Sequence, residues 1–80
     1  MEAKLIDFQT GWYEVNLGLR KEEIDTFITM LQQLKSGIID EIQAGGDYEG
    51  KTGIGDIIFY LQKADDDNLI FLGPSIKPNG

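Results

Sequence analysis

The chain has 80 residues, a length that fits one domain and is too short for two hydrophobic cores. It contains no cysteine and no histidine, which excludes a disulfide framework, thiolate metal sites and the catalytic pairs that depend on either residue. Fourteen acidic residues against seven basic ones give a net charge of −7, so the average field repels nucleic acid and anionic lipid surfaces.

Two runs near the start of the chain alternate with the period of two residues that is typical of β-strands. The first covers residues 3–10 and the second residues 12–19, with Gly11 in the turn between them. In the second run, Tyr13, Val15 and Leu17 alternate with mostly polar residues. We expect the two runs to pair as a hairpin.

After Arg20 the apolar spacing becomes helical. The apolar positions are Ile24, Phe27, Ile28, Leu31 and Leu34. Acidic residues at the start and Lys35 near the end match the helix dipole. Gly37 can cap this helix, but Ile42 lies four residues after Ile38 and continues the stripe, and the glycines at 45 and 46 offer a second stop. We favour a helix that continues past Gly37 or breaks there only briefly.

The remaining chain predicts a second hairpin. Residues 47–55 are rich in glycine and indicate a loop, and residues 56–63 are rich in β-branched and aromatic side chains. The acidic run at 65–67 then turns the chain into a strand at 69–72, and residues 74–80 form an irregular tail. The order ββαββ predicts one α+β domain over residues 1–80, a two-layer sandwich with one helix on one face of a four-stranded, largely antiparallel sheet.

Two segments invite a chemical interpretation. Residues 45–52 fit the phosphate-loop pattern G-x-x-x-x-G-K-[ST], but that mechanism needs a helix after the loop, whereas a strand is expected here. Asp47 and Glu49 would also place negative charge among the phosphates. The three aspartates at 65–67 and Asn68 offer oxygen ligands to calcium but lack the spacing of a calcium loop. We interpret the first segment as a loop joining helix to strand and the second as a turn, and we expect no cofactor and no metal.

One face of the predicted sheet has no helix to cover it. The strand register points Tyr13, Val15, Leu17, Ile57, Phe59 and Leu61 toward the helix. The candidate partner-binding residues on the opposite face are Trp12, Glu14, Asn16, Ile58, Tyr60 and Gln62. For Trp12 and Tyr60 two interpretations stay open, packing in the core or exposure as binding anchors.

Four segments carry a resemblance to a known family. They are WYEVNLGL, EEIDTFITMLQQLKSG, DIIFYLQ and DNLIFLGPSI, and together they span most of the chain. They resemble the small ββαββ immunity proteins that accompany bacterial polymorphic toxins, although the His-x-His strand of some such proteins is absent. The resemblance implies a stoichiometric inhibitor that blocks a toxin by binding, and it supplies no catalytic residue.

These observations predict a non-enzymatic, protein-binding module. No apolar stretch is long enough to span a membrane, and no signal-peptide pattern opens the chain, so we expect a cytoplasmic protein. Its partner would be a basic protein attracted by the acidic surface, although an acidic composition also serves solubility alone. The alternative is a structural or accessory module that buries its open sheet face in a homodimer.

Overall fold

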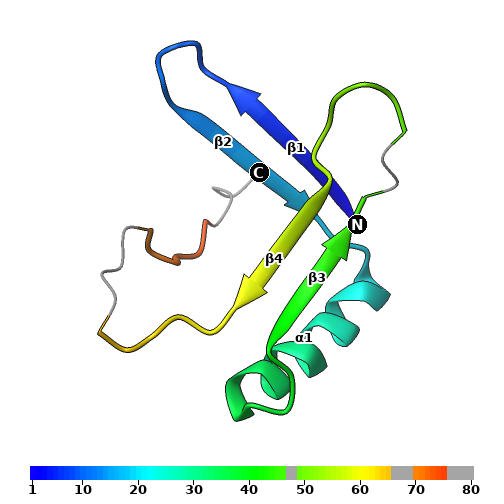
Figure 1. Cartoon of the computed structure of the whole chain (residues 1–80), viewed down its shortest axis with the longest axis vertical. Helices are drawn as coiled ribbons and strands as arrows, with labels where there is room; N and C mark the ends of the chain where they lie inside the picture. The colour runs from blue at the N-terminus through cyan, green and yellow to red at the C-terminus, as the bar shows by residue number, and fades with distance from the viewer. Residues whose placement is uncertain (47–48, 66–69, 76–80) are drawn as a thin grey trace, which may run out of the picture.

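In a computed structural model of the chain, the described residues form one helix and four strands (Figure 1). The structure describes residues 1–46, 49–65 and 70–75. In chain order the elements are β1 (Glu2–Asp7), β2 (Tyr13–Gly18), α1 (Lys21–Ser36), β3 (Glu41–Gly45) and β4 (Asp56–Tyr60). The α+β class predicted from the sequence is therefore confirmed.

The strands form two separate antiparallel sheets, β1 with β2 and β3 with β4 (Figure 1). Each strand has one hydrogen-bonded neighbour among the described residues, so each keeps one open edge. The four-stranded sheet expected from the sequence is not formed within this part of the chain.

The first hairpin forms where the period-two pattern predicts it. Leu5 lies opposite Val15, and Ala3 lies opposite Leu17. The amide of Phe8 donates to the carbonyl of Trp12 at 3.1 Å and closes the turn. The strands end before residues 8–12 because the backbone turns there, with Gly11 at a φ of 93°.

Helix α1 begins after Arg20 and ends at Ser36. At its start the amide of Arg20 donates to Oε1 of Glu23 at 3.0 Å. This bond satisfies an N–H group that has no carbonyl partner within the helix. At its end Gly37 adopts a left-handed φ of 81°, and its amide donates to the carbonyl of Leu34 at 3.2 Å. The prediction of a helix continuing past Gly37 is therefore wrong.

The segment after the helix is a strand instead. In β3, Ile42 lies opposite Phe59 of β4, and Ala44 lies opposite Ile57. Ile38 and Ile42 are four residues apart, as on a helix face, but the left-handed backbone at Gly37 ends the helix before them. In the strand that follows, Ile42 and Ala44 are two residues apart, so their side chains point to the same face of the sheet.

The core lies between α1 and the β3–β4 sheet. Figure 1 shows the helix running beside β3. Leu34 and Ile42, each 7% exposed, are the buried hydrophobic residues among those described. The rings of Phe27 and Phe59 also meet across this layer. Ile57 is half-buried, so the predicted orientation of Ile57 and Phe59 toward the helix is confirmed.

The other residues expected to face the helix do not reach it. Tyr13, Val15 and Leu17 belong to the first hairpin and remain between 36% and 59% exposed, and Leu61 lies beyond the end of β4 and is also exposed. The physical reason is that α1 packs on β3 of the second hairpin, so it leaves the first hairpin uncovered.

The predicted last strand is also corrected. Residues 70–72 are irregular and highly exposed, and Leu69 lies outside the described residues. Strand β4 pairs with β3, which precedes it, rather than with a later segment. Residues 74–75 are irregular as expected, whereas 76–80, the end of the predicted tail, lie outside the described residues.

Candidate protein-binding surfaces

The six predicted partner-binding residues fall on two different hairpins. Trp12, Glu14 and Asn16 belong to the first hairpin or its turn, Ile58 and Tyr60 belong to β4, and Gln62 follows β4. Because the two sheets are separate, the six residues do not share one sheet face.

Trp12 and Tyr60 are both exposed, so the interpretation that they pack in the core is wrong. Trp12 is 75% exposed beside the β1–β2 turn, and Tyr60 is 70% exposed at the end of β4. Neither ring packs in the core. Exposed large aromatic rings are typical anchors of protein interfaces.

The β4 outer face consists of Glu41, Gln43, Ile58 and Tyr60. Cross-strand pairing places Glu41 opposite Tyr60 and Gln43 opposite Ile58 on the side away from α1. Ile58 is 41% exposed. This surface combines an aromatic ring, a branched apolar side chain, a carboxylate and an amide, which is the composition of a small binding patch with a polar rim.

One face of the first hairpin is mostly polar. Nζ of Lys4 lies 3.2 Å from Oε1 of Glu2, and Nδ2 of Asn16 donates to Oε2 of Glu14 at 2.9 Å. All four side chains are exposed, so these contacts contribute little to folding. Glu14 and Asn16, two of the predicted partner-binding residues, are thus available to solvent beside Trp12.

The opposite face of this hairpin is apolar and was expected to be core. We call it the hairpin apolar face, and its members are Ala3, Leu5, Tyr13, Val15 and Leu17. Val15, in the middle of its strand, is 59% exposed. Apolar side chains ordered on one face of a sheet and left in water are typical of an interaction surface.

A second uncovered apolar surface lies on the helix. We call it the helix stripe, and its members are Ile24, Ile28 and Leu31. Ile28 is 49% exposed, whereas Phe27, on the adjoining part of the helix, packs on Phe59. The sequence pattern identified these positions as apolar, but it could not show that the sheet under them is too narrow to cover them.

Glu23 links the start of α1 to the start of β1. Its two carboxylate oxygens accept hydrogen bonds from the Met1 ammonium at 2.8 and 2.7 Å, and Oε1 also accepts from the Arg20 amide. The ammonium of Met1 and then the amide of Arg20 hold the pKa of Glu23 below its ordinary value of 4.5. This carboxylate therefore fixes the first hairpin at the N-terminal end of the helix.

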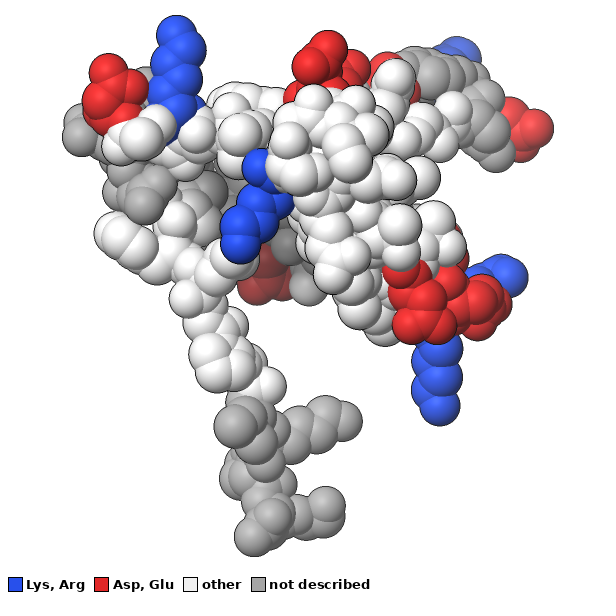
Figure 2. Space-filling view, turned by 90° about the horizontal axis from the view of Figure 1, so that it is seen from below, with Lys and Arg blue, Asp and Glu red and all other residues white. Residues whose placement is uncertain are grey.

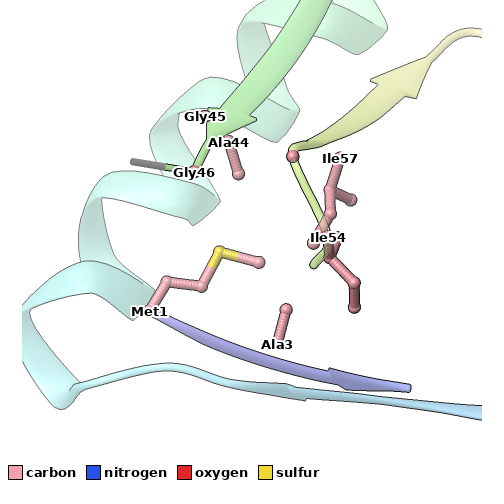
Figure 3. A pocket seen from close by; sticks show the side chains of 8 residues that line it. Met1, Ala3, Ala44, Gly45, Gly46, Ile54 and Ile57 are labelled. Carbon is pink, nitrogen blue, oxygen red and sulfur yellow. The ribbon is translucent and has the colours of Figure 1, made fainter. Parts of the chain in front are cut away.

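A shallow apolar cavity lies where the two hairpins approach each other (Figure 3). It measures about 190 Å³, and the side chains of Met1 and Ala3 point into it from one side, with Ala44, Ile54 and Ile57 on the other. Its lining side chains are aliphatic except for the thioether of Met1, and none of them is a carboxyl, hydroxyl or amide. It marks an incompletely filled junction between the two hairpins.

The phosphate-loop pattern lies in the β3–β4 connection. Gly45 ends β3, and the strand β4 follows the loop, as the sequence predicted. The prediction that the loop joins helix to strand is wrong, because it joins two strands of a hairpin. Within the described residues the element that follows Thr52 is the strand β4, so the helix N-terminus on which such loops bind phosphate does not come next.

The described residues contain neither a cluster of metal ligands nor a membrane-spanning helix. Within residues 1–46, 49–65 and 70–75, no group of three acidic side chains is placed to hold a metal ion. Asp65 belongs to this part of the chain, whereas the rest of the acidic run lies outside it. No helix in the same residues has the length and apolar character needed to cross a membrane.

Charge is unevenly distributed over the molecule. Seen from below, many charged side chains lie toward the outline, one basic side chain lies near the middle, and a broad area beside it is uncharged (Figure 2). Comparison with known proteins found no matching family model, no matching curated protein and no matching solved structure.

Proposed function

We propose that this chain is a non-enzymatic, protein-binding module of the cytoplasm, acting as a stoichiometric inhibitor or immunity protein for a basic protein such as a toxin that acts on nucleic acid. The observation that carries the proposal is the exposure of Trp12 and Tyr60 on ordered parts of a chain with a net charge of −7. Binding at these rings, rather than turnover of a substrate, is the activity that such a surface supports.

Aromatic rings and acidic charge have separate roles in this proposal. Trp12 and Tyr60 supply large apolar area at low entropic cost, so they would account for most of the affinity. Glu14 and Glu41 lie near them on the same hairpins and supply negative charge. Negative charge speeds the encounter with a basic partner and discriminates against acidic ones.

The composition supports a function without catalysis. The chain has neither histidine nor cysteine, so a general base of the usual kind and a thiol nucleophile are not available. The cavity between the hairpins is lined by aliphatic side chains, the thioether of Met1 and glycine. An inhibitor needs only a stable surface, which the strands provide.

The test uses the product of the gene adjacent to the one encoding this chain, purified and titrated by calorimetry. We expect one-to-one binding that weakens as salt is raised. Trp12→Ala and Tyr60→Ala should each weaken binding by about 2 kcal/mol. Phe71→Ala is the matched control, because Phe71 is an exposed aromatic residue outside the proposed surface. Equal losses in all three variants, or none, would contradict the proposal.

A second candidate function is a structural or accessory homodimer, and the hairpin apolar face favours it. Leu5, Val15 and Leu17 are ordered and exposed on one face, and their burial needs only another copy of the chain. The two-layer, four-stranded sandwich predicted from the sequence belongs to this proposal, since docking of the first hairpin beside β3–β4 would produce it.

A further inference from the structure

We propose that the hairpin apolar face of each chain lies over the helix stripe of a second copy, so that two chains exchange their β1–β2 hairpins in a symmetric dimer. The proposal rests on the self-association described as the second candidate function, and it specifies the two surfaces that meet. The β4 outer face stays free in this arrangement.

The first argument is that the two surfaces are complementary, one being an uncovered helix face and the other an uncovered sheet face. Ile24, Ile28 and Leu31 form an apolar helix surface without a sheet beneath it, whereas the hairpin apolar face is a sheet surface without a helix above it. The stripe from Ile24 to Leu31 extends about 10 Å along the helix and a strand of six residues about 20 Å, so the hairpin is long enough to cover it. Packing one on the other gives the two-layer arrangement that buries both.

The second argument is that the chain directs its hairpin away from its own helix stripe. Only Leu19 and Arg20 separate β2 from α1, and Arg20 is extended, with φ −75° and ψ 157°. The Glu23 carboxylate then holds both Arg20 and Met1 at the start of the helix. A short, fixed connection of this kind favours packing on another copy, as in domain exchange.

The third argument compares the exposed area with what a dimer needs. The chain exposes 7809 Å², whereas a compact protein of 9.0 kDa is expected to expose about 4,900 Å². The excess of about 3,000 Å² per chain, or about 6,000 Å² for two chains, is more than the roughly 2,000 to 5,000 Å² in total that obligate homodimers bury, so it is large enough to supply such an interface. A two-fold exchange uses the same pair of surfaces twice, so no further partner is required.

The charge of the chain does not oppose this contact directly. Asp7 at one end is the charged residue on the hairpin apolar face within β1 and β2. The helix stripe consists of aliphatic side chains, and the acidic residues Glu22 and Glu23 lie in the first turn of α1. Repulsion between two chains of net charge −7 is therefore spread over the outer surfaces, where salt screens it.

The first experiment is sedimentation of the whole chain and two single variants at micromolar concentration. We expect the wild type to sediment as a dimer of the 9.0 kDa chain. Val15→Lys should raise the dimer dissociation constant by about tenfold or more, because it buries a charge. Ile6→Lys adds the same charge to an exposed aliphatic position on the opposite face, so it should remain a dimer. A monomeric wild type overturns self-association altogether.

The second experiment separates hairpin exchange from other dimers. Val15→Lys and Ile28→Glu should each dimerise about tenfold more weakly or worse when alone. A mixture should form a heterodimer more readily than either, because one of its interfaces is native and the other pairs Lys with Glu. A dimer through two hairpin faces would not regain affinity on mixing. A dimeric wild type whose variants fail to combine therefore overturns the exchange and leaves self-association standing.

A conservative pair covers the case in which the charged variants do not fold. The chain has no cysteine, so Val15→Cys and Ile28→Cys each introduce a single thiol. Mixed and mildly oxidised, they should form a disulfide-linked heterodimer in preference to either linked homodimer. A preference for the Val15→Cys homodimer would contradict the proposed contact.

Discussion

The rings of Phe27 and Phe59 meet edge to face, with centroids 5.1 Å apart and planes inclined at 64°. This contact joins α1 to β4, beside the buried pair Leu34 and Ile42. It shows that the helix is held on the second hairpin by an aromatic pair from two distant parts of the chain. The fold therefore depends on a small number of side chains.

Phe27→Ala is expected to lower the free energy of unfolding by about 2 to 3 kcal/mol. This is less than the cost for a fully buried phenylalanine, because the ring of Phe27 is only half-buried. Phe59→Ala should cost a similar amount, and the double variant should show a coupling of about 1 kcal/mol. Urea melts followed by circular dichroism measure all three. Phe8→Ala is the control, because Phe8 is half exposed in the first hairpin. A loss at Phe8 equal to that at Phe27 would contradict this account of the core.

Trp12→Ala is expected to change the free energy of unfolding by no more than about 0.5 kcal/mol, because the side chain has little buried area to lose. Trp12 is the only tryptophan, so its fluorescence reports on this position alone. The native protein should emit at nearly the wavelength of the urea-unfolded chain. Emission shifted clearly to the blue in the native state would show that the ring is buried.

Gly46→Ala is expected to destabilise the β3–β4 hairpin, whereas Gly45→Ala is not. A Cβ on Gly46 would lie 2.6 Å from the carbonyl oxygen of Gly55 and 2.9 Å from that of Ile54, so the backbone would have to move. The expected cost is about 2 kcal/mol or more. On Gly45 the nearest atom is Oδ1 of Asp56 at 3.5 Å, an ordinary contact. Equal stability of the two variants in thermal melts would show that the close approach is not required.

The contacts of Glu23 predict that the free energy of unfolding falls at acidic pH. Its folded-state pKa is lowered by the Met1 ammonium and the Arg20 amide, so the carboxylate adds stability above its ordinary pKa of 4.5. That contribution should be lost as the pH falls through the lower, folded-state pKa. Glu23→Gln should be less stable than wild type at neutral pH, and the difference should shrink in acid. Glu22→Gln, in the same helical turn, keeps the Arg20 hydrogen bond and is the control in urea melts at successive pH values.

The local elements were largely predictable from the sequence. Alternation around Val15 and helical spacing around Phe27 are each long enough to identify one element type, and β1, β2, α1 and β4 follow them. Strand β3 was missed because Glu41–Gly45 contains only two inward apolar residues, Ile42 and Ala44. A pattern of five residues cannot distinguish a strand from the end of a helix. Gly37 was a usable signal, because glycine readily adopts the left-handed conformation that ends many helices.

The surfaces could not be predicted in the same way. Val15 and Ile28 have the pattern of core residues, and only the position of α1 on β3 shows that they are exposed. The same limit applies to Trp12 and Tyr60, for which the sequence allowed both core and anchor. Whether an apolar residue is covered depends on contacts between distant elements, and local periodicity does not encode them.

The open strand edges of the two hairpins have a consequence for handling the protein. An unpaired edge presents amide and carbonyl groups to which any other strand can add, so the four edges left open among the described residues make the chain prone to edge-to-edge aggregation. Mutual repulsion between acidic chains opposes this addition. The excess of negative charge thus acts as colloidal protection, and high salt or acid, which weaken it, are the conditions in which the chain should precipitate before it unfolds.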